Sequence, residues 1–367
     1  MKLSVLTKAA AIGGLAALTL TSCAANEAAP ATGGSEGATS SLSGELIGAG
    51  ASSQDAAQNA WVAGFQTINS GVTVNYDPTG SGAGRETFQQ GASAFAGSDR
   101  AFKLDEISAG PFEACAADSG IVEFPAYISP IALIFNVEGV DNLKLDAPTV
   151  AQIFEGKIAK WNDPAIAAQN EGANLPDLAI TAVHRSDESG TTGNFTDYLA
   201  AAAPADWTAG SIESWPAEFG GEGAQGTSGV VAAVTSGVGT IGYADASQAG
   251  ELGTVEIKVG DEYVAYSPEA AAAIVDASPI EEGRGANDLA ITLDRSSTEK
   301  GVYPIVLVSY LIGCEAYADP ANAELVKAYF GYIASEEGQQ AAAEAAGSAP
   351  ISASLREKIT PAIDAIS

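Results

Sequence analysis

Short apolar runs alternate along the chain with stretches whose apolar residues recur every three or four positions. Residues 45–50 and 72–77 have the composition of strands, and Ala57, Trp61 and Phe65 repeat between them at helical spacing. The same pattern predicts further strands at 127–137, 178–184, 239–245 and 302–313, and further helices from about Arg85 and at 149–161, 191–203, 323–335 and 336–346. Alternating strands and helices predict an α/β fold whose sheets are covered on both faces.

Two further observations limit this prediction of the fold. No unit of about 20–50 residues repeats with recognisable similarity, which excludes solenoids and propellers. Residues 250–300 combine weak strand and helix signals with turn residues, so no element is assigned there in detail.

Composition adds a bound on size and on partners. The chain has 367 residues, 46% of them hydrophobic, which is enough for the core of one large or two moderate domains. Its 46 acidic and 16 basic side chains give a formal net charge of -30 at pH 7. Because a field of this sign repels polyanions, nucleic acid is excluded as a partner.

The first residues have the features of an export signal. Lys2 and Lys8 form a basic start, and they are followed by an uncharged stretch at 9–20. This stretch is too short to cross a bilayer as a helix. We therefore expect the protein to be exported.

The end of this signal is similar to a bacterial lipobox. The residues Leu-Thr-Ser-Cys at 20–23 predict a signal peptide at 1–22 and lipidation of Cys23, although an ordinary signal peptide with an incidental cysteine is the alternative. Lipid on Cys23 would hold the protein on the outer face of the cell membrane. Residues 23–43 are poor in large apolar side chains and predict a flexible tether behind the anchor.

Two further cysteines, Cys115 and Cys314, lie in the part of the chain predicted to fold. In an exported protein one disulfide between them is the simplest expectation, and two buried free thiols are the alternative. A bond would bring the end of the chain back against its beginning.

Three segments rich in glycine and hydroxyl residues each precede a predicted helix. They are GAGASSQDA (48–56), TGSGAGRET (79–87) and RSDESGTTGN (185–194). Glycine lets the backbone approach a ligand, hydroxyls donate hydrogen bonds, and the first turn of a helix has free N–H groups. Each segment alone is typical of a helix cap and turn, but together they predict a cradle for an oxyanion.

A serine hydrolase is the competing enzymatic hypothesis. Ser189 would be its nucleophile and His184, the only histidine, its base, yet a G-x-S-x-G motif is absent. The glycines at 80–84 also lack the spacing of a dinucleotide-binding loop, and no Walker motif is present. One histidine and unclustered cysteines predict no metal site.

Taken together, six segments resemble the substrate-binding lipoproteins of Pst-type phosphate ABC transporters, the PstS-like members of the periplasmic-binding-protein superfamily. From about Gly48 onward, in the family's order, they are GAGAS, YDPTGSGAG, FAGSDRAF, IFEGKIAKWNDPAI, RSDESGTTGNFTDYL and GTIGYAD. The resemblance implies a type II periplasmic-binding-protein fold, in which two α/β domains are joined by hinge strands and the ligand lies in the cleft. It also implies high-affinity binding of inorganic phosphate and its delivery to a permease for import, with no catalysis and no cofactor.

The resemblance assigns ligand residues motif by motif. The implied phosphate ligands are Ser52, Ser53, Ser81, Asp99, Arg185, Ser189, Gly190 and Thr191, with Asp187 orienting Arg185. Two positions depart from the family pattern: Ser53 stands where phenylalanine is familiar, and Glu188 where glycine is usual. The second departure adds a negative charge close to the implied site.

The chemistry of these residue types suits a protonated oxyanion. A guanidinium such as that of Arg185 can bind two ligand oxygens at once, and a nearby Asp187 can hold it in place. Asp99 is an acceptor when ionised, so it would bind the proton that phosphate keeps at neutral pH and repel sulfate. A receptor for another oxyanion such as sulfate remains the alternative within the binding class.

The resemblance also implies how the chain divides. We expect one lobe from residues 44–123 with 306–367 and a second from 124–305. Hinges are expected near Phe124-Pro125 and Tyr303-Pro304. Cys115 and Cys314 would both lie in the first lobe, so a disulfide would not obstruct closure. The protein is expected to act as a monomer, with permease subunits as its protein partners.

Overall fold

A computed structural model describes residues 42–276 and 278–367. The predicted signal peptide, the predicted lipidation site Cys23 and nearly all of the predicted tether lie outside these residues. The described residues belong to one compact unit.

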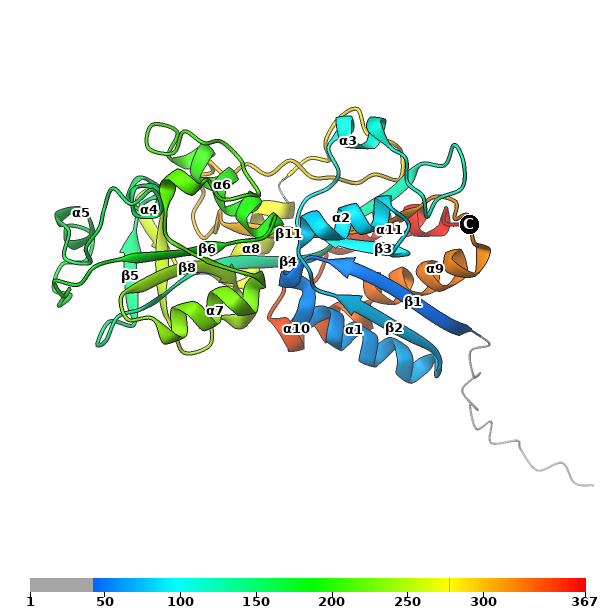
Figure 1. Cartoon of the computed structure of the whole chain (residues 1–367), viewed down its shortest axis with the longest axis horizontal. Helices are drawn as coiled ribbons and strands as arrows, with labels where there is room; N and C mark the ends of the chain where they lie inside the picture. The colour runs from blue at the N-terminus through cyan, green and yellow to red at the C-terminus, as the bar shows by residue number, and fades with distance from the viewer. Residues whose placement is uncertain (1–41, 277) are drawn as a thin grey trace, which may run out of the picture. The chain divides into compact units, whose positions relative to one another are not determined.

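One mixed sheet organises the described chain, and its long central strand β4 is shared by the two lobes (Figure 1). The strand order is β2-β1-β3-β11-β4-β8-β6-β7, with β5, β9 and β10 joined through the pairing of β9 with β4. The first part of the long strand β4 (Ile121–Asn136) pairs with β11, from Ile121 to Pro130. From Ile131 onward, β4 pairs with β8 instead. The chain is therefore a two-lobed α/β protein in which β4 runs from one lobe into the other.

The first lobe surrounds the β2-β1-β3-β11 side of the sheet. Its strands are β1 (Ser43–Gly50), β2 (Gly71–Asp77), β3 (Phe95–Ser98) and β11 (Val306–Cys314). Its helices are η1 (Ser52–Gln54), α1 (Asp55–Ile68), α2 (Ser81–Gln89), α3 (Leu104–Ala109), α9 (Pro320–Ala334), α10 (Glu336–Ala346) and α11 (Ala353–Asp364).

The second lobe surrounds the β8-β6-β7 side. Its strands are β5 (Asn142–Leu145), β6 (Thr181–Arg185), β7 (Glu222–Ala224), β8 (Thr240–Asp245), β9 (Gly253–Val259) and β10 (Glu262–Val264). Its helices are α4 (Ala147–Phe154), α5 (Pro164–Ala167), α6 (Gly190–Ala202), η2 (Ala217–Phe219), α7 (Gly226–Ser236), η3 (Ala246–Gln248) and α8 (Pro268–Asp276).

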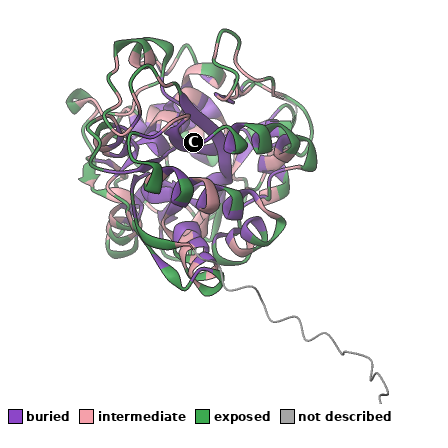
Figure 2. Cartoon of the chain, turned by 90° about the vertical axis from the view of Figure 1, so that its right-hand side faces the viewer, coloured by how far each residue is buried: buried purple, intermediate pink, exposed green. Residues whose placement is uncertain are grey.

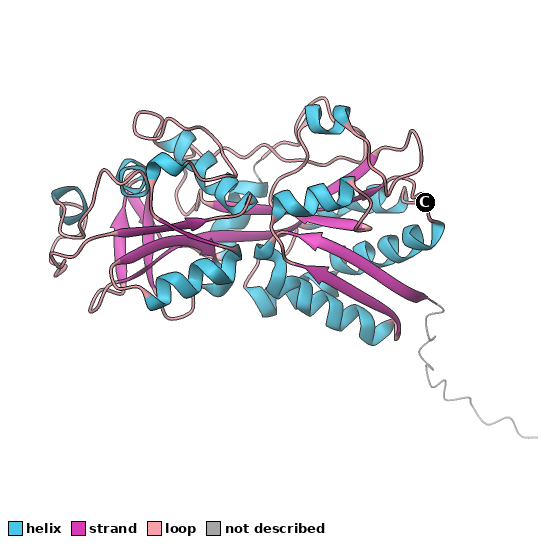
Figure 3. Ribbon diagram, viewed as in Figure 1, coloured by secondary structure: helices cyan, strands magenta, loops and turns pink. Residues whose placement is uncertain are grey.

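Helices cover the sheet above and below in both lobes (Figure 3). Trp61 and Phe65 of α1 are buried against the first-lobe core, as the helical spacing predicts. Seen from the first-lobe end, buried strands lie inside a shell of helices whose outer faces are exposed (Figure 2). This layering is what the alternation of strand and helix in the sequence predicts.

Local capping residues explain where several helices begin and end. The side chains of Asp146, Ser189, Ser335 and Ser352 accept a backbone N–H of the following helix at α4, α6, α10 and α11. Gly347 ends α10 in the left-handed conformation, at φ 59°. The prediction of a helix over 336–346 is therefore confirmed.

One predicted helix extends past its end in the structure. The helix predicted over 149–161 ends in the structure at Phe154. Gly156 has φ of +74°, which turns the chain out of the helix, and the Lys160–Trp161 stretch then bonds to the segment before β6. Apolar spacing continued past this turn because Ile158 and Trp161 are buried without being helical.

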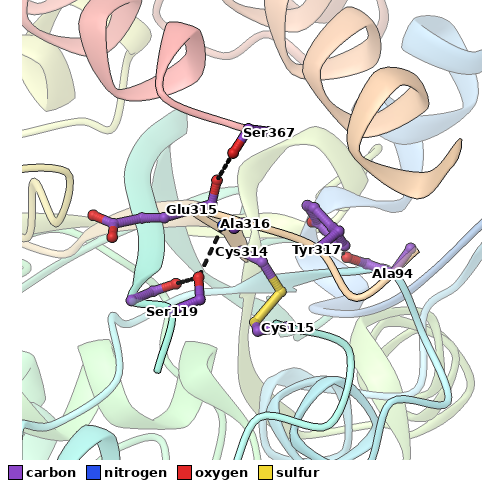
Figure 4. The surroundings of a disulfide bond; sticks show 9 residues. Ala94, Cys115, Ser119, Cys314, Glu315, Ala316, Tyr317 and Ser367 are labelled. Carbon is purple, nitrogen blue, oxygen red and sulfur yellow. Dashed lines mark hydrogen bonds between the residues drawn. A yellow bond between two sulfur atoms is a disulfide. The ribbon is translucent and has the colours of Figure 1, made fainter. Parts of the chain in front are cut away.

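A disulfide joins Cys115 to Cys314, the last residue of β11 (Figure 4). Two nearby hydrogen bonds join the same two segments. Ala116 N–H donates to the carbonyl of Ala316 at 2.8 Å, and Ala316 N–H donates to Ser119 Oγ at 2.8 Å. The C-terminal end of the chain is thus fastened to the segment after α3, within the first lobe.

Candidate functional site

The loop between β6 and α6 presents the RSDESGT motif to the interface between the lobes. Ser189 caps α6 by accepting the N–H of Thr192 at 3.2 Å, so Gly190 and Thr191 form the first turn. Arg185 ends β6 and is 2% exposed. The N-terminus of a buried helix beside a buried guanidinium is a strongly anion-attracting arrangement.

Asp187 holds the Arg185 side chain. Arg185 Nε donates to Asp187 Oδ1 at 2.8 Å, and Arg185 Nη2 donates to Oδ2. Asp187 also accepts the N–H of Gly226, at the start of α7, at 3.0 Å. Although burial opposes its ionisation, the hydrogen bonds and charge of Arg185 lower the pKa of Asp187. Within the described residues, Nη1 of Arg185 makes no hydrogen bond, so this nitrogen is available to a ligand.

The first lobe contributes three side chains from three elements. Ser53 lies in η1, Ser81 begins α2 and Asp99 directly follows β3. Ser53 Oγ donates to Asp99 Oδ1 at 2.6 Å, and Asp99 N–H donates to Ser81 Oγ at 3.1 Å. All three residues are buried. The segments that the sequence singled out therefore meet at one point of the first lobe.

The residues at the start of α6 also contact the first-lobe residues. Thr191 Oγ1 donates to Asp99 Oδ2 at 2.9 Å, and Asn194 Nδ2 donates to the Asp99 carbonyl at 2.6 Å. A Cβ added at Gly190 would lie 2.6 Å from both Ser81 Oγ and Asp99 Cβ. The lobes are therefore closed on one another at this point, and only glycine fits at the start of α6.

Ser52 lies at the side of this cluster. Its Oγ accepts the N–H of Thr227 at 3.1 Å and is 3.2 Å from Thr227 Oγ1, in the first turn of α7. A second helix N-terminus thus reaches the interface beside the first.

Burial and hydrogen bonding oppose each other at Asp99. Removal from water raises its pKa, and hydrogen bonds from Ser53, Ser309 and Thr191, together with the charge of Arg185, act in the opposite direction. Burial has a larger effect than the hydrogen bonds and the charge together, so the pKa of Asp99 lies above the ordinary value of 3.8.

Ion pairs cross the interface beside the cluster. Glu213, from the loop after α6, contacts Arg85 of α2 at 2.8 Å and Arg100 at 2.6 Å. Glu188 contacts Arg85 at 3.1 Å, with its side chain 53% exposed. The extra carboxylate at position 188 is therefore paired with an arginine at the edge of the interface.

Sequence reasoning missed several residues of this region. Glu213, Asn194 and Thr227 make the cross-lobe contacts described above, and Ser309 of β11 donates to Asp99 Oδ1 at 2.7 Å. Asn194 lies in the quoted RSDESGTTGN segment, and its position one turn after Gly190 could have drawn attention to it. Glu213, Thr227 and Ser309 carry no local motif, because their partners are more than 100 residues away in sequence.

The geometry does not support the hydrolase hypothesis. His184 stacks on Trp215, with ring centroids 4.9 Å apart, and its Nδ1 lies 2.9 Å from the carbonyl of Arg185. Ser189 Oγ accepts the N–H of Thr192 as the cap of α6. No hydrogen bond joins Ser189 to His184 among the described residues, so the nucleophile and base of a hydrolase are not paired.

Neither a metal cluster nor a membrane helix is found in the described part of the chain. Across 42–276 and 278–367, no group of three or more His, Cys, Asp or Glu side chains could hold a metal ion. No helix in the same ranges is long and apolar enough to cross a bilayer.

Two α/β lobes that close over buried hydroxyls, helix N-termini and one arginine define a two-lobed binding protein. The family described as the PBP superfamily domain matches residues 30–337. Phosphate-binding protein PstS2 of Mycobacterium bovis (strain BCG / Pasteur 1173P2) is 36% identical over 332 residues, which cover 88% of this chain and 87% of the relative. Phosphate-binding protein PstS 3 of Mycobacterium leprae (strain TN) is 37% identical over 329 residues, covering 88% and 86%. The chain belongs to the PstS-like family of the PBP superfamily.

Solved structures agree with this fold. A high affinity periplasmic phosphate-binding protein (PfluDING), solved bound with phosphate, superposes with a TM-score of 0.69 and 20% identity, covering 87% of this chain and 93% of that one. At this identity the likeness establishes the two-lobed fold alone.

Proposed function

We propose that this protein binds one inorganic phosphate between its lobes and delivers it to the permease of a phosphate ABC transporter for import. The observation that carries the proposal is the convergence, in one buried cluster, of the first turn of α6 and Arg185 with Ser53, Ser81 and Asp99. Relatives of more than one third identity are phosphate-binding proteins. The structural and the sequence arguments point to the same ligand.

Each proposed ligand has a distinct role. Arg185 offers Nη1 to a phosphate oxygen while Asp187 holds its other nitrogens. Gly190 and Thr191 offer the free N–H groups of the first turn of α6. The remaining proposed donors are the hydroxyls and backbone N–H groups of Ser52, Ser53, Ser81, Ser189 and Thr191.

Asp99 is the proposed acceptor for the proton of phosphate. An ionised carboxylate repels an anion that has no proton, and this favours phosphate over sulfate. The net charge of -30 does not prevent capture, because charges beyond about 8 Å are screened at physiological salt whereas the donors of the site touch the ligand.

The proposal extends to the placement and cycle of the protein. An export signal at 1–22 and a lipid on Cys23 would keep it outside the cell and beside its permease. Closure and opening would occur about hinges near Phe124-Pro125 and Tyr303-Pro304, between lobes at 44–123 with 306–367 and 124–305. Binding and release as a monomer, with no chemical reaction, complete the proposed cycle.

Calorimetric titration of phosphate and then sulfate tests this function. The purified protein is first unfolded and refolded to remove any bound anion. We expect one phosphate site of micromolar affinity or tighter, which corresponds to at least about 8 kcal/mol, and no heat from sulfate. Binding of sulfate in preference to phosphate would support the other-oxyanion alternative, and no binding of either anion by folded protein would refute the receptor proposal.

A further inference from the structure

A chain of buried polar side chains leads from the core of the first lobe to Asp99. Its members are Tyr329, Gln58, Gln54 and Ser309, and this set is called the polar chain below. None of the four is more than 1% exposed. Such groups are costly to bury unless each has a hydrogen-bond partner.

Every link of the polar chain is a short hydrogen bond. Tyr329 OH donates to Gln58 Oε1 at 2.8 Å, and Gln58 Nε2 donates to Gln54 Oε1 at 2.8 Å. Gln54 Nε2 then donates to Ser309 Oγ at 2.6 Å. Ser309 Oγ donates to Asp99 Oδ1 at 2.7 Å. The polar chain therefore ends on the carboxylate that is proposed to read the ligand's proton.

The direction of these bonds follows from chemistry. Gln54 Nε2 also contacts the backbone carbonyl of Tyr310 at 3.2 Å. Because a carbonyl can only accept, the amide nitrogen of Gln54 must face Tyr310 and Ser309. The oxygen of Ser309 is then used as an acceptor, and its single hydrogen is left to point at Asp99. Ser309 is thereby fixed as a donor.

We propose that the polar chain, acting through Ser309, holds Asp99 as a hydrogen-bond acceptor and so sets the preference for protonated over unprotonated oxyanions. This inference rests on the proposed phosphate function and goes beyond it, since no residue of the polar chain is among the proposed ligands. A neutral Asp99 could donate a hydrogen bond to sulfate, whereas an ionised Asp99 cannot. Ser309 and Gln54 are positioning residues in this scheme.

Other groups around Asp99 do not replace this role. Ser53 and Thr191 also donate to it, but both are among the proposed ligands, and the single hydrogen of either hydroxyl would leave Asp99 if it turned to the anion. Among charged or titratable side chains, Arg185 and Tyr76 interact with Asp99. Arg185 is shared with the ligand, and burial together with the charge of Asp99 raises the pKa of Tyr76, so it stays neutral. Ser309 is the donor that faces Asp99 from the core side.

A glycine makes room for the polar chain. A Cβ at Gly97 would lie 2.6 Å from Gln54 Oε1 and 2.4 Å from Tyr76 OH. The glycine of the FAGSD segment thus leaves room for the Gln54 side chain against β3.

The test compares Ser309→Ala with Ser93→Ala, using phosphate and sulfate titrations between about pH 5 and about pH 8. Ser93 is also buried in the first lobe, and its hydroxyl contacts only Thr87 at 3.4 Å among the described side chains. Loss of one hydrogen bond to the carboxylate favours its neutral form. For Ser309→Ala we expect weaker phosphate binding by about tenfold or more and sulfate binding that becomes measurable.

The pH profile separates this role from mere structural support. As the pH is lowered, the phosphate affinity of Ser309→Ala should begin to fall at a higher pH than that of the wild type or of Ser93→Ala. General damage to the site would weaken phosphate binding without making sulfate binding measurable, and it would leave that pH unmoved. Gln54→Leu should shift selectivity and pH profile in the same direction, and it replaces Ser309→Ala if the latter does not fold.

Two results would overturn the inference. If the wild type selects phosphate while Ser309→Ala and Gln54→Leu keep its selectivity and pH profile, the polar chain has no role in specificity and the phosphate function stands. If the wild type binds no phosphate, the proposed function and this inference fail together.

Discussion

Asp99 accepts hydrogen bonds from side chains of three separate elements, namely Ser53 of η1, Thr191 of α6 and Ser309 of β11. A carboxylate that is 3% exposed would be strongly disfavoured without such donors. The same bonds that make its burial tolerable also leave it facing the proposed ligand as an acceptor. Packing and ligand choice therefore depend on one side chain.

Asp99→Asn tests that dependence. The amide keeps an oxygen for Ser53 and Ser309 but adds a donor, so we expect phosphate binding to weaken by about tenfold to a hundredfold and discrimination against sulfate to decrease. Calorimetric titration with both anions measures this. Asp141→Asn removes the same charge from an exposed position and should bind like the wild type. Unchanged selectivity in Asp99→Asn would remove Asp99 from the recognition scheme.

At the scale of elements, the N-terminus of α6 and the loop that follows the helix act together. The first turn of α6 faces Asp99 and Ser81, and Glu213 in the loop reaches Arg85 and Arg100 on the other lobe. One lobe is thus joined to the other both inside the cluster and at its edge. We expect each contact to favour the closed arrangement.

Gly190→Ala should prevent that closure. Its Cβ would lie 2.6 Å from Ser81 Oγ, so the lobes would have to separate, although alanine itself favours a helix by about 1 kcal/mol over glycine. We expect phosphate affinity to fall at least about tenfold with unfolding free energy unchanged or higher. Denaturant unfolding and calorimetry measure the two. Gly331→Ala, where a Cβ meets nothing within 4 Å, is the matched control. Wild-type affinity in Gly190→Ala would contradict this description of closure.

Glu213→Gln should speed the release of phosphate. Losing the carboxylate leaves Arg100, whose side chain is 22% exposed, without a charged partner across the interface, and it leaves Arg85 with only the half-exposed Glu188. We expect about tenfold faster dissociation, because breaking a partly buried ion pair acts mainly on release. Stopped-flow tryptophan fluorescence follows the release, and Glu218→Gln, at an exposed position of η2, is the control. Equal dissociation rates in the two variants would show that these pairs do not hold the lobes together.

At the scale of the whole molecule, β4 passes from one lobe into the other beside a buried acid. Asp245, at the end of β8, accepts from Tyr127 OH of β4 at 3.1 Å and from Ser247 N–H at 3.0 Å. Burial raises the pKa of Asp245 to about 6, although these hydrogen bonds oppose the rise. The junction of the lobes therefore contains a group that titrates near neutral pH.

This group should make stability depend on pH. Between about pH 4 and about pH 6 the folded protein keeps a proton on Asp245 that the unfolded chain releases, so the free energy of unfolding falls as pH rises through this window. The loss from this one group is on the order of 2–3 kcal/mol. Denaturant unfolding of the wild type and Asp245→Asn across the window measures it, with Asp141→Asn as control. Parallel pH profiles for wild type and Asp245→Asn would refute the assignment.

Sequence reasoning succeeded where the determining contacts are local. The bounds of α10 follow from Ser335 and Gly347, and the pairing of Arg185 with Asp187 spans two residues. It failed at the end of α4, where the turn at Gly156 ends the helix while buried residues continue the apolar spacing. It also could not find Ser309 or Glu213, because such contacts depend on how distant segments meet rather than on any nearby pattern.

The place of β11 in the sheet also sets an order of assembly. Although β11 is the last strand in sequence, it lies between β3 and β4, at the centre of the first-lobe sheet. Most second-lobe strands come from one continuous stretch and can pair early. The pairing of β11 with β3 and β4 joins distant segments, and contacts of large sequence separation form slowly. A chain still being synthesised or exported therefore exposes the unpaired edges of β3 and β4 until its C-terminal segment arrives. We expect that interval to be when the protein is most prone to aggregation and most dependent on chaperones.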